Sequence, residues 1–384
     1  SVDGNMIISG ITTLGTTSFA VDATITTGKL GIGFTDTNVK VGSGAADALT
    51  TGGSNTAVGH DAMTNTTSGG SNVAVGFEAL KLNTTGQTNV AVGERAMQQN
   101  TTGSENIGIG QFGLQVNTTG DRNTAVGYGA LDSNTTGGSN TGIGNRALQS
   151  NTTASNNTAV GTNALEQNST GAQNTALGAQ ALYNNTTAAY NVAVGYNALM
   201  ANTTGTQNTA VGSFALEDIT TASYCTAIGY NGLRNNAGGN NTACGYSALQ
   251  DNTTGTNNTA VGYNALVTNT TASDNTAVGK DALKLNTTGD LNTAIGVNAM
   301  GNTTNNDRNV AVGYAALQNI SDGQGDTYHT ALGYGAGNSI QTATQFTGVG
   351  ANAGLSLTTG NGNTFVGYNA GSATTTGAWN TVVG

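Results

Sequence analysis

The chain has no proline, only two cysteines and two histidines among its 384 residues, and charged residues make up only 8% of it. Disordered chains are usually enriched in proline and charge and lack regularly spaced apolar residues, so this composition argues against disorder over residues 55–384. Two cysteines cannot form a disulfide framework. Each replaces a residue of the repeat described below, and we expect Cys244 to be a small core residue and Cys225 a tolerated variant.

The small number of charged residues and histidines also narrows the classes of function that the chain can have. The ten lysines and arginines are scattered singly and the formal net charge is −10, which argues against nucleic acid as a partner. No stretch reaches the roughly 18 consecutive apolar residues of a membrane span. His60 and His329 lie at opposite ends of the repeat array, so they cannot form a triad or a metal cluster within one chain. We therefore expect no enzymatic activity, no cofactor and no metal, and interpret the Asp322–Asp326 segment as a solvated loop rather than a cation site.

What the chain has instead is an internal repeat. Asn55-Thr-Ala-Val-Gly59 recurs as Asn89-Val-Ala-Val-Gly93 and Asn123-Thr-Ala-Val-Gly127, with closing glycines almost always 17 residues apart. Twenty copies run from Gly59 to Gly384, interrupted by one 16-residue step and one 20-residue step. A period of 17 is too short for a pair of helices, and glycine with paired threonines opposes a helix. The repeat predicts an all-β fold, a parallel β-solenoid of about twenty coils.

The consensus coil, Asn-Thr-Ala-Val-Gly-Tyr-Asn-Ala-Leu-x-x-Asn-Thr-Thr-Gly-x-x, predicts a short strand, a glycine corner, an apolar Ala-Leu segment and a polar turn in which Asn and Gly tolerate positive φ. In-register stacking predicts core columns of Val58-type, Ala62-type and Met63-type residues. With period-2 alternation each strand also turns apolar side chains outward. The outward face then needs a cover, most simply a homotrimer packed along the rod axis.

The expected domains are a β-rich cap or connector over residues 1–50 and a repeat rod over 51–384, irregular near 230–245 and 314–333. The last repeat ends at Gly384 with no capping segment. Two alternatives stay open there: the chain continues, or the next molecule stacks on it to give an end-to-end filament.

Two surface features carry the binding hypotheses. Asparagines of the turn begin N-glycosylation sequons, yet the same spacing suits a hydrogen-bonded asparagine ladder, which we favour. These residues are Asn65, Asn83, Asn100, Asn117, Asn134, Asn151, Asn168, Asn185, Asn202, Asn252, Asn269, Asn286 and Asn302. Aromatic residues after the closing glycine could stack on sugars or pack the corners between coils, and we favour corner packing. The candidate surface-binding aromatics are Tyr128, Tyr196, Tyr230, Tyr246 and Tyr263.

The repeated segment Asn-Thr-Ala-Val-Gly-Tyr-Asn-Ala resembles the head repeats of trimeric autotransporter adhesins, the hemagglutinin-type β-roll, and repeats of phage tail fibres. The resemblance covers residues 55–384, although the period here is longer than that of the adhesin repeat. It implies a trimeric, extracellular rod at a cell or virion surface, with cell-surface glycans as partners. We expect a non-enzymatic structural or adhesive fibre. The alternative is a ligand-binding solenoid for ice or carbohydrate.

Overall fold

The computed structural model describes residues 37–320 and 325–384, which form short parallel β-strands joined by turns, with no helix among them. Each strand has three residues. In chain order they are β1 Val39–Val41, β2 Thr56–Val58, β3 Val73–Val75, β4 Val90–Val92, β5 Ile107–Ile109, β6 Thr124–Val126, β7 Thr141–Ile143, β8 Thr158–Val160, β9 Thr175–Leu177, β10 Val192–Val194, β11 Thr209–Val211, β12 Thr226–Ile228, β13 Thr242–Cys244, β14 Thr259–Val261, β15 Thr276–Val278, β16 Thr293–Ile295, β17 Val310–Val312, β18 Thr330–Leu332, β19 Thr347–Val349, β20 Thr364–Val366 and β21 Thr381–Val383.

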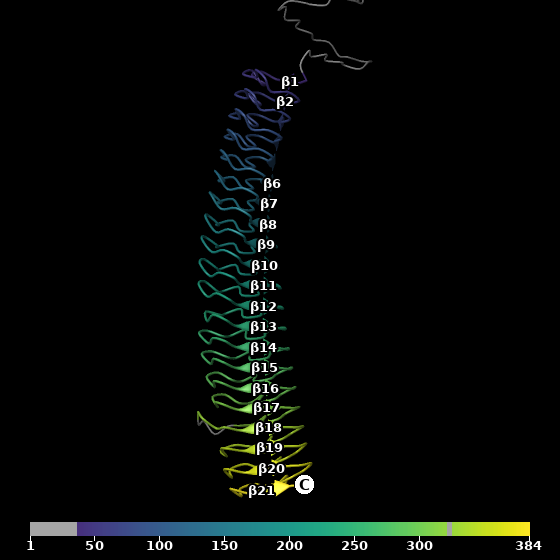
Figure 1. The fold of residues 1–384 in the computed structure, drawn as a ribbon, viewed down its shortest axis with the longest axis vertical. Coiled ribbons are helices and arrows are strands. Elements are labelled where there is room, and N and C mark those ends of the chain that lie inside the picture. The colour runs from purple at the N-terminus through teal and green to yellow at the C-terminus, as the bar shows by residue number, and fades with distance from the viewer. Residues whose placement is uncertain (1–36, 321–324) are drawn as a thin grey trace, which may run out of the picture. The chain divides into compact units, whose positions relative to one another are not determined.

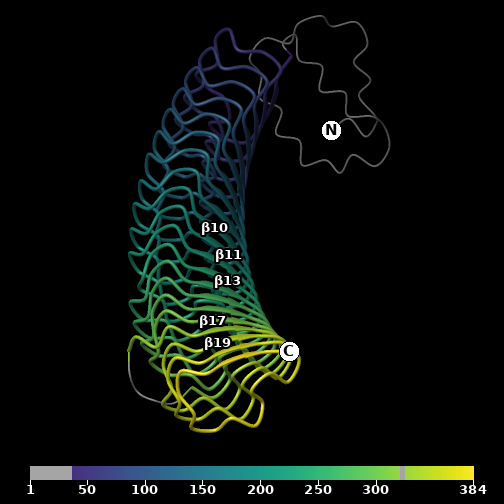
Figure 2. The ribbon, with the colours of Figure 1, turned by 60° about the horizontal axis from the view of Figure 1, so that its bottom comes forward.

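Every strand pairs in parallel with the strand of the next coil. In the β2–β3 pair, for example, Ala57 lies opposite Ala74 and Val58 opposite Val75. The coils from Thr37 to Gly384 form one compact unit, which is a curved rod with all strands on one side (Figure 1). Figure 2 shows the same coils stacked one on another along the rod. The predicted all-β parallel solenoid with a 17-residue coil is confirmed.

The solenoid begins earlier than the sequence indicated. Strand β1 lies inside the segment expected to be a cap, yet it pairs with β2 in the common register, with Lys40 opposite Ala57. The solenoid unit therefore starts at Thr37. The rest of the expected cap, residues 1–36, lies outside the described residues, as do Asp322 and Gly323 of the long step.

The two irregular steps leave the sheet intact. Across the short step Thr226 pairs with Thr242, and across the long step Val310 pairs with Thr330, both in the common register. The missing and additional residues are therefore accommodated in the turns and not in the strands.

The core is narrower than we expected. Ala57, Ala62 and Met63 are fully buried, whereas Val58 and its equivalents face outward and are partly exposed. The prediction of a core valine column was therefore wrong. Because strand side chains alternate between two faces, only the central residue of each three-residue strand points inward. A Cβ added to Gly142 at this position would lie 3.0 Å from the carbonyl oxygen of Ala147 and 3.4 Å from Cγ of Leu131, so the interior there has room for no side chain larger than a methyl group.

The residues with positive φ are also not those that the sequence predicted. The Asn-Thr-Thr-Gly turn was expected to hold the positive φ values, but these occur at residues such as Leu80 (φ 52°) and Thr88 (φ 55°). That prediction was wrong because contacts between coils determine the conformation. Leu80 donates its N–H to the carbonyl oxygen of Ala96, at 3.0 Å. At the corner, Gly161 has φ 137°, and a Cβ there would lie 2.6 Å from the Gly178 carbonyl group. Glycine at this corner is therefore required by both conformation and space.

Candidate functional site: two asparagine ladders and an aromatic stripe

The most regular polar feature is the asparagine that precedes each strand, which we call the first ladder. Asn72 donates its backbone N–H to Oδ1 of Asn55 (2.9 Å) and its Nδ2 to the carbonyl oxygen of Gly86 (3.0 Å). The same pattern recurs along the rod, and these side chains are almost all buried. These residues were not among the predicted site residues. The signal was an asparagine at the first position of nearly every repeat.

The second ladder is made of the turn asparagines. Asn100 donates Nδ2 to Oδ1 of Asn83 and to the carbonyl oxygen of Gly103, both at 2.9 Å. Gly103 also accepts from Nδ2 of Asn89 of the first ladder, so the two ladders share the turn carbonyl. The predicted residues in this ladder are Asn83, Asn100, Asn117, Asn134, Asn151, Asn168, Asn185, Asn202, Asn252, Asn269 and Asn286.

Asn65 and Asn302 do not belong to the second ladder, although both begin the same Asn-Thr-Thr segment. Each lies one residue too early relative to the core methionine of its coil, so Thr66 and Thr303 occupy the buried ladder position. Asn302 is exposed and donates to Oδ1 of Asn319 at 2.7 Å. Asn236, which begins no sequon, is in the ladder and accepts from Nδ2 of Asn252 at 2.6 Å. Counting from the core leucine or methionine would have found all three.

The ladder geometry bears on glycosylation. Both hydrogens of Nδ2 in a residue such as Asn151 are donated, one to Oδ1 of Asn134 (2.8 Å) and one to the carbonyl oxygen of Ala154 (3.1 Å). A sugar on that nitrogen would replace one donor and would need space that a fully buried side chain lacks. In the folded rod the arrangement therefore favours the ladder over glycans at these positions. Asn65 is exposed, so N-glycosylation stays a hypothesis for this residue.

Cys244 was expected in the core, and that prediction was wrong, whereas Cys225 was expected only to be a tolerated variant. Cys225 is buried and takes an asparagine position in the first ladder, where its backbone N–H donates to Oδ1 of Asn208 at 2.9 Å. Burial raises the pKa of the Cys225 thiol. Cys244 is exposed, because it ends β13 at an outward-facing position. The error follows from treating the valine column as core.

His329 also occupies a first-ladder position. Its backbone N–H donates to Oδ1 of Asn309 (2.8 Å), and its ring Nδ1 accepts the backbone N–H of Phe346 (3.2 Å). The imidazole thus accepts the hydrogen bond that an asparagine oxygen accepts elsewhere. Burial lowers the pKa of His329 to about 4, and the nearby carbonyl group of Ala343 acts weakly in the opposite direction.

The aromatic residues form a stripe along one side of the rod. Tyr230, Tyr246 and Tyr263 stack face to face, with ring centroids 5.4 and 5.3 Å apart. Tyr196 joins this stack through an edge contact with Phe214, and Tyr128 makes an edge contact with Phe112. The ring faces that would stack on a sugar are therefore occupied by neighbouring rings in the Tyr230–Tyr263 run. This geometry agrees better with corner packing than with a sugar platform.

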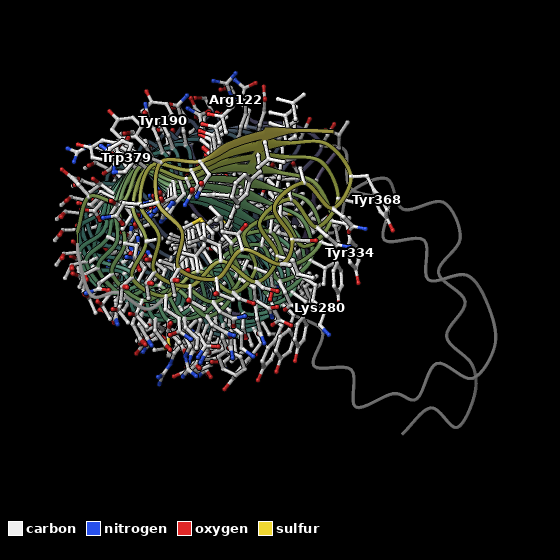
Figure 3. The ribbon with its side chains drawn as sticks, turned by 90° about the horizontal axis from the view of Figure 1, so that it is seen from below. Arg122, Tyr190, Lys280, Tyr334, Tyr368 and Trp379 are labelled. Carbon is white, nitrogen blue, oxygen red and sulfur yellow. The ribbon has the colours of Figure 1, made fainter. Side chains whose placement is uncertain are left out.

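A second set of aromatics lies elsewhere on the surface and was not singled out. Tyr190, Tyr224 and Trp379 are exposed at the residue that precedes the first-ladder position of their coils. Figure 3 shows Tyr190 and Trp379 pointing outward with Arg122 on one side of the rod, and Tyr334 and Tyr368 pointing outward elsewhere on it.

Several acidic side chains on the described surface pair with bases. Glu78 accepts from Nζ of Lys81 (2.7 Å) and Nε of Arg95 (3.1 Å), and the Lys81 hydrogen bond lowers the pKa of Glu78. Asp326, of the long step, forms an ion pair with Arg308. Over residues 37–320 and 325–384, no group of three or more His, Cys, Asp or Glu side chains is arranged to hold a metal ion.

No protein-family model matches the chain, and a comparison with curated proteins finds no match. The part of the chain that the structure describes contains no helix with the length and apolar character to cross a membrane.

Proposed function

We propose that the chain is a non-enzymatic structural and adhesive rod, an extracellular element of an appendage, a filament or a virion fibre. The observation that carries this proposal is the parallel pairing in one register from β1 to β21, continuous across both irregular steps. At about 4.8 Å per strand, this pairing gives a rod about 95 Å long.

The regular side chains support a mechanical role. Both asparagine ladders bond one coil to the next, and the Ala, Leu and Met columns pack between coils. In such a solenoid each coil contacts only its neighbours, so stability comes from a repeated coil-to-coil interface. A rod of this kind spans distance and presents the same surface along its length.

The resemblance to the head repeats of trimeric autotransporter adhesins and to phage tail-fibre repeats supports the same proposal. The shared segment, Asn-Thr-Ala-Val-Gly, is the ladder asparagine, the strand and the corner glycine of each coil. By this analogy the rod assembles as a homotrimer and meets cell-surface glycans.

Electron microscopy of the native particle, with mass per length, tests the proposal. Rods about 100 Å long with several chains in cross-section are the expected result. Long continuous filaments would instead indicate end-to-end assembly. Compact particles with no rod shape would overturn the proposal.

A second candidate function, a ligand-binding solenoid that orders water at an ice surface, is favoured by one observation. Threonine occupies the first, outward-facing strand position in six successive strands, β11 to β16, at a regular spacing. The threonines of the turn are less suited to this role, because the first of each pair donates its hydroxyl to the next coil, as Thr84 does to the carbonyl oxygen of Thr101. Thermal hysteresis in the purified protein tests the ice alternative, and a glycan array tests carbohydrate binding.

A further inference from the structure

The outward face of the sheet carries a continuous apolar stripe. We define the Thr/Val strip as the first and third residues of strands β2 to β21, whose side chains point away from the core. The third residue is valine, isoleucine, leucine or cysteine in every one of these strands. Many are well exposed, for example Leu177 at 48% and Ile228 at 45%. None of the strands β2 to β21 contains Lys, Arg, Asp or Glu.

This strip is large for a surface that faces water. Twenty strands spaced about 4.8 Å apart and three residues wide present about 950 Å² of face, shared by a mostly threonine first column and an apolar third column. Monomers rarely expose apolar patches above a few hundred Å². A stable interface needs about 800 Å² from each partner. The strip alone is therefore sufficient for one such interface.

The period of the strip identifies its occupant. An apolar side chain recurs at every strand spacing along the whole rod, so only a partner with the same spacing and length can place an apolar group opposite each one. A second copy of this chain has both. Because the strip is uncharged, two identical copies meet there without like-charge repulsion, although the chain has a formal net charge of −10.

The direction of packing follows from residues that depart from the pattern. The first strand position is threonine in most coils but Val73, Val90 and Ile107 in three successive strands. Copies that run parallel and in register place strands β3, β4 and β5 opposite their own copies, so the three strands with apolar first and third residues meet. Fully overlapped antiparallel copies would place Val73 opposite Thr347 and Val90 opposite Thr330. Only Ile107 would meet an apolar first residue, Val310.

We infer that the Thr/Val strip is the self-docking face of the rod, on which further copies pack in parallel and in register. This inference rests on the self-association in the proposed function and specifies which surface makes it.

Lysine substitutions on and off the strip test the surface. The strip variant is Leu177→Lys with Ile228→Lys. The matched control is Leu291→Lys with Val297→Lys, which are as exposed (49% and 39%) but lie off the strip, in the outer turn and after the corner glycine. We expect the wild-type protein and the control to sediment as multiples of 38.0 kDa, and the strip variant to sediment as a monomer with an unchanged β circular dichroism spectrum.

Cys244 tests the register without any risk to folding. It lies on the strip and is exposed, whereas Cys225 is buried, so a short bis-maleimide reacts with the native protein at Cys244. Parallel, in-register copies bring their Cys244 residues to the same height and give a cross-linked band of twice the chain mass. Cys244→Ser removes that band. Fully overlapped antiparallel copies place Cys244 opposite β9, about 19 Å along the rod from its equivalent, and give none.

The outcomes separate the inference from the proposed function. An oligomeric strip variant, or an oligomeric wild-type protein without the Cys244 cross-link, overturns the self-docking face and leaves self-association intact. A monomeric wild-type rod overturns both self-docking and self-association but leaves the rod itself. A particle that is not a rod overturns the proposed function as a whole.

Discussion

Protonation of His329 should weaken the rod at one defined place. The side chain is buried between Asn309 and Phe346, and its pKa in the folded chain is lowered from 6.5 to about 4. As the pH falls below about 6.5, the His329 imidazole binds a proton in the unfolded state, whereas in the folded state it stays neutral until about pH 4. Stability is therefore present in full above pH 6.5 and is lost between pH 6.5 and 4.

The size of this loss follows from the shift. A difference of about 2.5 pKa units, at 1.36 kcal/mol per unit, corresponds to about 3 kcal/mol. Because each coil contacts only its neighbours, the loss should fall on the interfaces of β17, β18 and β19 and not on distant coils. In a uniform solenoid this makes one coil boundary the first to open in acid.

Hydrogen–deuterium exchange at pH 7 and pH 4.5 measures the effect. After correction for intrinsic rates, peptides covering residues 329–349 should lose protection at pH 4.5 relative to peptides covering residues 158–177. The matched control is His329→Asn, which restores the residue common at this position and removes the titrating group. Equal protection of the two regions at both pH values, or the same pH dependence in His329→Asn, would refute the reasoning.

Three further predictions concern the features that hold the coils together, and each is measured as the change in free energy of chemical unfolding. Asn151→Ala should cost about 3 kcal/mol, because it removes one hydrogen-bond partner each from Oδ1 of Asn134, Nδ2 of Asn168 and the Ala154 carbonyl oxygen. The control Asn65→Ala, at the exposed sequon, should cost less than about 0.5 kcal/mol. Equal losses of unfolding free energy in the two variants would show that the ladder hydrogen bonds do not stabilise the fold. Leu165→Ala should cost about 2–5 kcal/mol through the cavity it leaves in the core, and Leu285→Ala, at a well-exposed position, less than about 1 kcal/mol; similar values would contradict the assigned core. Gly161→Ala should cost at least about 2 kcal/mol, because the added Cβ would lie 2.6 Å from the Gly178 backbone. The control Gly129→Ala, with φ +60° and its nearest neighbour 3.6 Å away, should cost about 1 kcal/mol. A Gly161→Ala variant as stable as the control would show that the corner does not require glycine.

The period of the repeat was enough to predict the fold, because an in-register solenoid repeats its chemistry at every coil. The regular recurrence of glycine, at positions such as Gly59 and Gly76, predicted both the parallel sheet and the corner. The residues that fill the coil interior were predicted less accurately than the fold. Ala57 and Val58 are both apolar neighbours in sequence, and only the width of the coil decides that alanine points inward.

The candidate site was predicted unevenly for similar reasons. The ladder asparagines were found through their sequons, but Asn65 shares the sequon and lies one residue away from the ladder position. Ladder membership depends on distance from the core leucine or methionine, a structural coordinate, and not on the local motif. The tyrosine stripe was visible in the sequence, yet whether Tyr230 and Tyr246 offer their faces to a sugar or to each other depends on side-chain rotation, which no periodicity encodes.

The places where both ladders change together indicate that the two asparagine columns act as one polar unit. Where the second-ladder position becomes Ile219, Ile320 or Ile340, the next first-ladder position becomes Cys225, His329 or Phe346. The exception is the coil with Leu357, which is followed by Asn363. A first-ladder and a second-ladder asparagine donate to one turn carbonyl, as Asn89 and Asn100 do to Gly103. They also contact each other directly, as Asn241 does through Nδ2 with Oδ1 of Asn236 at 3.1 Å.

An isoleucine in one column removes polar partners from the buried environment of the other, where an unsatisfied amide is costly. Replacing both positions avoids that cost, because apolar groups that fill the same space need no hydrogen bonds. A double-mutant cycle at one coil tests the coupling, with Asn185→Ile and Asn191→Cys made singly and together, as in the natural Ile219 and Cys225 pair. The double variant should be more stable than the sum of the two single losses predicts, and simple additivity would contradict a shared polar unit.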